Sequence, residues 1–191
     1  MSESAPPNLP LEDQLQALYA SALQASHEGR IDDAVQGWQQ CLALLPRFPQ
    51  VHHLLGAEHA QAGRYGDAVL HLSLAIEQDP ALATARLQLG LLWLTLEAPG
   101  QATQVLQPLL AGPASDALTQ FAAGLSALAM NDMSTAERHV AQGLSLPLEN
   151  VPLRKDMEKL LASVRAAVAT DAPPAVPAHH GLAISAYTGA H

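Results

Sequence analysis

The sequence predicts an all-α fold, a solenoid in which pairs of helices stack one after another. Small residues recur every 34 positions, at Ala22, Gly56, Gly90 and Gly124. A second column of small residues follows twelve positions later, at Ala34, Ala68, Ala102 and Ala136. The chain is also 49% hydrophobic but only 4% aromatic, so its core must consist mainly of leucine and alanine, which suits closely packed helices. A fixed period of roughly 20–50 residues is typical of stacked helical units.

The spacing of apolar residues predicts four helix pairs within residues 11–148. The four repeats span about 15–48, 49–82, 83–116 and 117–150. In order, the eight helices are expected at about 11–28, 31–45, 50–62, 65–78, 81–96, 99–110, 115–130 and 133–146. Residues 1–10 are rich in serine and proline, and we expect them to be disordered.

Glycine and proline define the ends of the first two pairs. Gly29 breaks the first helix and Gly63 breaks the third. Pro46 closes the first pair, because proline cannot continue a helix interior. At the next boundary we expect Asp79 to cap the fifth helix, with Pro80 at its first position.

The third and fourth pairs repeat this arrangement with one irregularity. Pro99 stands where the start of a helix tolerates proline. Pro108 falls late in the same helix, where it removes a backbone donor. We therefore expect a kink or an early end at Pro108.

A ninth helix is predicted over residues 151–169. Its apolar side carries Leu153, Met157, Leu160, Leu161 and Val164. Its other side carries four of the nine basic residues, Arg154, Lys155, Lys159 and Arg165. A one-sided helix after a solenoid is the usual cap, because the last repeat would otherwise expose its apolar face to water.

The repeats resemble the tetratricopeptide repeat (TPR) family, from about Leu15 to Leu148. The second repeat, counted from Pro49, has the family's residues in phase at Leu55, Gly56, Gly63, Tyr65, Ala68, Leu72, Ala75 and Pro80. The other repeats match at fewer positions, including Gly29, Trp38, Pro46, Leu89, Gly90, Trp93, Ala102, Gly124 and Ala136. The departures are His52, Arg86 and Gln120, where the family has a large apolar residue, and Gly143, where it has alanine. The resemblance implies a right-handed α-solenoid that binds other proteins.

The resemblance also implies a concave groove, lined by the first helix of each pair, in which TPR proteins usually bind peptides. The positions that would line it are Tyr19, Leu23, His27, His53, Ala57, Ala60, Leu87, Leu91, Leu94, Phe121, Leu125 and Leu128. This lining is apolar, and it lacks the lysine, asparagine and arginine with which some TPR proteins hold the acidic C-termini of heat-shock chaperones. It therefore predicts a foreign apolar or amphipathic segment as ligand, or packing against another part of the same chain.

Residues 170–191 begin as a proline-rich linker and end in an apolar segment. That segment carries Leu182, Ile184 and Tyr187, which a disordered tail usually lacks. One interpretation is that the tail docks in a groove, either in the same molecule or across a homodimer. The other is a frayed chain end.

Charge and composition narrow the partners and the compartment. The formal net charge is −9, with 18 acidic and 9 basic residues, so the chain repels nucleic acid and anionic membranes, and we expect neither as a partner. The first residues lack a signal-peptide pattern, and no run of apolar residues is long enough for a membrane span. With Cys41 as the single cysteine, we expect a cytoplasmic protein, and its alanine- and leucine-rich composition is typical of bacteria.

Catalytic and metal-binding patterns are weak. Four of the nine histidines gather at His52, His53, His59 and His71, but none has the i, i+4 spacing of a zinc-binding helix. We expect these to be ordinary surface or groove histidines, with no metal and no cofactor. No nucleophile elbow or phosphate-binding glycine loop is present in the sequence, so we expect no enzyme.

The function that these patterns favour is a non-enzymatic adaptor or chaperone that binds an apolar or amphipathic segment of another protein. Two alternatives stay open. One is a chaperone like the small TPR proteins of bacterial secretion systems, which shield exported subunits. The other is a structural protein that assembles through its own tail.

Overall fold

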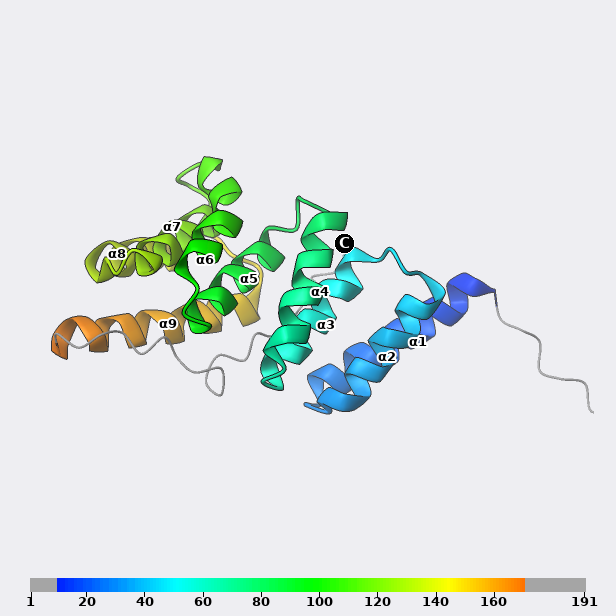
Figure 1. Ribbon diagram of the computed structural model, residues 1–191. Helices are drawn as coiled ribbons and strands as arrows, with labels where there is room; N and C mark the ends of the chain where they lie inside the picture. Colours follow the sequence, from blue (N-terminus) through cyan, green and yellow to red (C-terminus); the bar gives the residue numbers. More distant parts are fainter. Residues whose placement is uncertain (1–9, 171–191) are drawn as a thin grey trace, which may run out of the picture.

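The computed structural model describes residues 10–170, and this part of the chain contains nine α-helices, one short 3-10 helix and no strand. Figure 1 shows the helices as a row of adjacent pairs, from α1 and α2 at one end to α7, α8 and α9 at the other. The all-α solenoid predicted from the 34-residue period is confirmed.

Four helix hairpins form the repeats. They are α1 (Leu11–His27) with α2 (Ile31–Leu44), α3 (Pro49–Gln61) with α4 (Tyr65–Gln78), α5 (Ala83–Thr95) with α6 (Pro99–Leu106), and α7 (Ala117–Ala129) with α8 (Met133–Ser145). The 3-10 helix η1 (Gln107–Ala111) follows α6, and α9 (Val151–Thr170) follows the last hairpin.

The turn inside each hairpin has the same left-handed conformation. Positive φ angles of 73, 72, 55 and 59° occur at Gly29, Gly63, Glu97 and Asn131, which are spaced by the repeat length. In every turn the residue after the positive-φ residue donates its backbone N–H to the carbonyl five residues before it, at 2.8–2.9 Å. This bond closes the first helix of the pair, and glycine or asparagine is the residue that takes this conformation at least cost.

The predicted column of small residues lies where the two helices of a hairpin cross. The facing pairs are Gly56 with Leu72, Gly90 with Leu106, and Gly124 with Val140. A Cβ atom added at any of these glycines would lie 2.6–2.7 Å from a side-chain carbon of its partner. The three partners are fully buried, so the glycines are what permits the backbones to approach this closely.

Gly143 stands where the TPR pattern has alanine, and it faces an aromatic ring. A Cβ atom added there would overlap the ring carbons of Phe121, which is itself fully buried. The glycine therefore gives the large side chain of the fourth repeat its space.

Proline affects two boundaries differently. Pro108 ends α6 early, as predicted: the α-helix stops at Leu106 and continues as the 3-10 helix η1. The prediction for Asp79 and Pro80 is wrong, because α5 begins only at Ala83. The Asp79 carboxylate accepts a hydrogen bond from the N–H of Ala81 at 2.9 Å, and so holds a turn ahead of the helix rather than capping it.

Helix α9 packs along α8 at the end of the row (Figure 1). Arg154 donates to the carbonyls of Leu144 and Leu146, at 2.8 and 3.2 Å, where α8 ends. Arg165 pairs with Glu137 of α8 at 2.8 Å, so two of the basic residues hold α9 against the last hairpin. Neither α9 nor any other helix among residues 10–170 is both long and apolar enough to cross a membrane.

Candidate functional site

The predicted groove residues lie on the first helices of the hairpins, α1, α3, α5 and α7, and we call the face that these residues share the inner surface. Burial on this surface increases after the first hairpin. In α3 every residue from Val51 to Ala60 is buried, and α5 and α7 are buried almost all round. Whether a foreign segment binds along these helices stays a prediction.

Six predicted groove residues of the third and fourth hairpins belong to one apolar core with α9. Leu87, Leu91, Leu94, Phe121, Leu125 and Leu128 are at most 8% exposed. The same buried cluster contains Leu153, Met157, Leu160, Leu161 and Val164 of α9. This is packing within the same chain, one of the two arrangements that the sequence left open.

In α3, the predicted groove residue His53 makes a buried hydrogen bond to the next hairpin. Its Nε2 atom lies 2.8 Å from Oε1 of Gln88 in α5. An amide oxygen only accepts, so His53 donates from Nε2. Burial lowers the pKa of His53 to about 4, although the bond to Gln88 opposes this shift, so the ring is neutral at pH 7. The other two predicted groove residues of α3, Ala57 and Ala60, are buried as well.

The inner surface is more open at α1. Tyr19 and Leu23 are half-buried there, and His27 is exposed. The ring centre of Tyr19 lies 5.0 Å from that of Trp38, in an edge-to-face contact, and 5.9 Å from that of Phe48, in a stacked contact. Beside it is a hollow of about 290 Å³ lined by Glu12, Leu15, Gln16, Tyr19 and Phe48.

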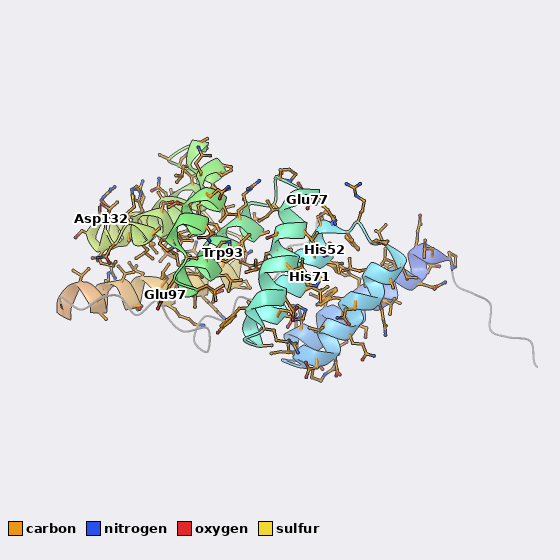
Figure 2. The ribbon with its side chains drawn as sticks, in the orientation of Figure 1. His52, His71, Glu77, Trp93, Glu97 and Asp132 are labelled. Atoms are coloured by element: carbon orange, nitrogen blue, oxygen red, sulfur yellow. The ribbon has the colours of Figure 1, made fainter. Side chains whose placement is uncertain are left out.

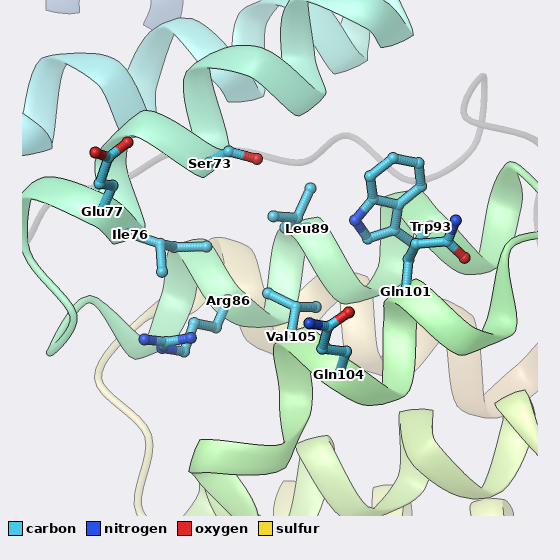
Figure 3. A pocket seen from close by; sticks show the side chains of 9 residues that line it. All are labelled: Ser73, Ile76, Glu77, Arg86, Leu89, Trp93, Gln101, Gln104 and Val105. Carbon is cyan, nitrogen blue, oxygen red and sulfur yellow. The ribbon is translucent and has the colours of Figure 1, made fainter.

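A second hollow, of about 420 Å³, lies between α4, α5 and α6. Figure 3 shows Leu89 and Val105 in its centre, Trp93 on one side, and Glu77 and Arg86 toward the other. Its remaining lining residues are Ser73, Ile76, Gln101 and Gln104. The prediction missed this hollow. The sequence nevertheless carries a signal for it. The large Trp93 and the smaller Val105 stand where the previous repeat has His59 and His71.

Three histidines stack between α3 and α4, and we call them the histidine stack: His52, His71 and His59. The ring of His71 lies 5.3 Å from His52 and 5.5 Å from His59, with interplanar angles of 26 and 11°. The Nδ1 atoms of His52 and His71 are 3.0 Å apart. His52 and His59 are each 6% exposed, so they lie in the packing between helices and not on the surface.

The contact between His52 and His71 has a counterpart in the last hairpin. There Nδ1 of His139 lies 2.8 Å from Oε1 of Gln120. Both pairs are 19 residues apart and occupy equivalent repeat positions. Two of the departures from the TPR pattern, His52 and Gln120, are therefore polar residues with a polar partner on the second helix.

Burial changes the acid–base properties of the histidine stack. It lowers the pKa of all three side chains, since desolvation disfavours the charged imidazolium. The pKa of His71 falls to about 4, and the neighbouring His52 and His59 contribute to that shift. Within residues 10–170 no group of three or more histidine, cysteine or acidic side chains is arranged to hold a metal ion.

The tail residues Leu182, Ile184 and Tyr187 lie outside the described residues, as do residues 1–9. Docking of the tail and disorder of the N-terminal segment therefore stay predictions.

The fold and the inner surface together define the chain as an α-solenoid of helix hairpins, and solved structures of MamA have a similar fold. The structure titled MamA RS-1 ArsTM double mutant matches with a TM-score of 0.61 and 16% identity, over 93% of this chain and 96% of that one. MamA 41-end from Desulfovibrio magneticus RS-1 matches with a TM-score of 0.61 and 18% identity, over 84% and 96%. A crystal structure of MamA protein matches with a TM-score of 0.59 and 17% identity, over 83% of this chain and 90% of that one. At these identities the likeness is one of fold, and no family model and no curated protein matches the chain.

Proposed function

We propose that this protein is a TPR-type adaptor that binds an apolar or amphipathic segment of another protein along its inner surface. The observation that carries the proposal is the packing of α9. This one-sided helix shares a buried core with six of the residues predicted to line the groove. Apolar side chains that share a core with one amphipathic helix have the chemistry to contact another.

The part of the inner surface that supports binding best is α1. Leu23 and Tyr19 are only half-buried there, and the hollow beside Tyr19 offers space for an apolar side chain of a ligand. Glu12 stands at that hollow, and the net charge of the chain is −9. A segment with apolar anchors and basic flanking residues complements this surface.

Selection of short peptides from a phage-displayed library, with the full chain as target, tests the proposal. We expect the selected peptides to have apolar residues at helical spacing. Leu23→Asp should weaken their binding by about tenfold or more, because it puts an unpaired carboxylate into the contact surface. Raising the salt concentration should weaken binding only modestly, since salt screens the basic flanking residues of the ligand but not the apolar contacts that carry most of the affinity.

A matched control is Leu70→Asp. Leu70 is 54% exposed on α4, outside the inner surface, so this variant adds the same charge without touching the proposed site. Equal loss of binding in both variants, or affinity that collapses at high salt, would show that the inner surface is not the binding site.

A further inference from the structure

Hydrogen bonding determines which nitrogen carries the proton in two rings of the histidine stack. The carbonyl of Pro46 can only accept, so Nε2 of His52, at 3.3 Å, donates to it. Nδ1 of His52 then has no proton in the neutral ring. The 3.0 Å contact between the two Nδ1 atoms therefore requires His71 to donate from its Nδ1. Figure 2 labels the two residues, which come from α3 and α4.

This arrangement accepts one proton but not two. A first proton can enter at Nε2 of His71, where it leaves the bond between the Nδ1 atoms intact. Within the pair of His52 and His71, a second proton must go to Nδ1 of His52, and two N–H groups would then face each other at 3.0 Å. His59, stacked on His71, has a buried Nδ1 with no hydrogen-bond partner among the described residues, so it gives the second charge no stabilisation.

Few charged groups act on the histidine stack. Asp67 of α4 favours protonation of His59 and His71, whereas Arg64, just before α4, disfavours it at His59. Arg64 is in turn paired with Asp32 of α2 at 3.0 Å. Together with the Pro46 carbonyl, these contacts place the stack at the junction between the first and second hairpins.

We propose that the histidine stack is a proton-sensitive joint in the second hairpin: neutral, it holds α3 and α4 together next to the first hairpin, and doubly protonated, it drives these two helices apart. The proposal goes beyond the adaptor function and does not depend on it. The third and fourth hairpins have no such pair of histidines. At the equivalent positions the third hairpin has Arg86 and Val105, and the fourth has Gln120, whose amide oxygen still accepts from a charged His139.

The direction of the pH effect follows from the lowered pKa values. An unfolded histidine titrates at about pH 6.5, and the pKa of folded His71 is about 4. Between these values the unfolded chain binds more protons than the folded one. The stability contributed by the stack is therefore complete above about pH 6.5 and is lost as the pH falls toward 4.

Nitrogen NMR of the full chain labelled with ¹⁵N-histidine tests the arrangement directly. At pH 7.5 we expect His71 as the Nδ1–H tautomer, His52 as the Nε2–H tautomer, and a scalar coupling between their Nδ1 atoms across the hydrogen bond. The opposite tautomer at His71, or an ordinary titration midpoint near 6.5 for all three rings, would overturn the proposal.

Thermal unfolding at pH 7.5 and pH 5 tests the consequence. We expect the melting temperature of the wild type to fall by roughly 4 °C more than that of His71→Val, which places the third hairpin's residue at this position. His52→Gln, which copies the pair of Gln120 and His139 in the last hairpin, should also reduce the fall in melting temperature. It replaces His71→Val as the test variant if the valine variant does not fold. His139→Gln is the control: burial lowers the pKa of His139 too, but its partner Gln120 still accepts from the charged ring, so this variant should keep most of the wild-type fall. If the melting temperature falls equally between pH 7.5 and pH 5 in the wild type, His71→Val and His52→Gln, the proposal is overturned.

Discussion

Gly56 and Leu72 meet where α3 crosses α4 with no space for a methyl group between them. A Cβ atom added to Gly56 would lie 2.6 Å from Cγ of Leu72 and 3.1 Å from its backbone nitrogen. The clash includes backbone, so a change of rotamer alone cannot relieve it. The distance between the two helices of a hairpin therefore depends on one missing side chain.

Gly56→Ala should destabilise the protein by about 1–3 kcal/mol, because the added methyl group overpacks a closed crossing. Chemical denaturation measures the change. Gly66→Ala is the matched control: Gly66 lies in α4 and a Cβ there meets nothing within 4 Å, so alanine should be neutral or slightly stabilising. If the two variants unfold at the same denaturant concentration, the crossing is not closely packed.

Glu97→Gly should stabilise the protein by about 0.5–1.5 kcal/mol, because Glu97 has a φ of 55° in a turn where the first two hairpins have glycine. Asn131 has a similar φ of 59°, but asparagine tolerates this region better. Asn131→Gly should therefore give a smaller gain. A loss of stability in Glu97→Gly, measured by denaturant unfolding, would contradict a shared turn conformation.

The buried pair of His53 and Gln88 should behave as a coupled unit. Either single change to leucine leaves a buried polar group without its partner and should cost about 1–3 kcal/mol. The double variant removes both polar groups, so it should lose less stability than the sum of the two single variants. Additive losses in a double-mutant cycle would mean that the 2.8 Å bond contributes nothing.

The crossings and turns were predictable because each needs one type of residue at one repeat position. A 34-residue column of small residues locates the crossings, and Gly29 and Gly63 locate two turns. The pattern could not show that Glu97 and Asn131 adopt the same backbone, since neither residue requires a left-handed conformation. Similarly, proline limits where a helix can run but does not determine its first residue, which is why α5 begins later than predicted.

The histidine contacts were not predictable from helical spacing, because the two partners come from different helices. The repeat pattern held a signal nonetheless. At one position the chain has His52, Arg86 and Gln120 in place of an apolar residue, and each makes a polar contact. The groove residues of α5 and α7 share their core with α9, and the period of the repeats carries no information about where α9 packs.

Substituting the three apolar tail residues with aspartate in the full chain tests tail docking. If Leu182, Ile184 and Tyr187 occupy the inner surface, the triple variant should bind the selected peptides more tightly, because a competitor held at high local concentration is lost. If the tail joins two molecules, the variant should have a lower mass in sedimentation experiments. A variant that matches the wild type in both measurements would make the tail a plain chain end.

Photo-crosslinking of a selected peptide to the full chain, mapped by mass spectrometry, tests the adaptor proposal most directly. The peptide carries a photoreactive group at one of its apolar positions. We predict crosslinks to α1 between Leu15 and His27, where the inner surface is most open, and to Phe48, which lines the hollow beside Tyr19. Crosslinks that fall instead on the second helices of the hairpins, or in the hollow beside Trp93, would contradict binding along the inner surface.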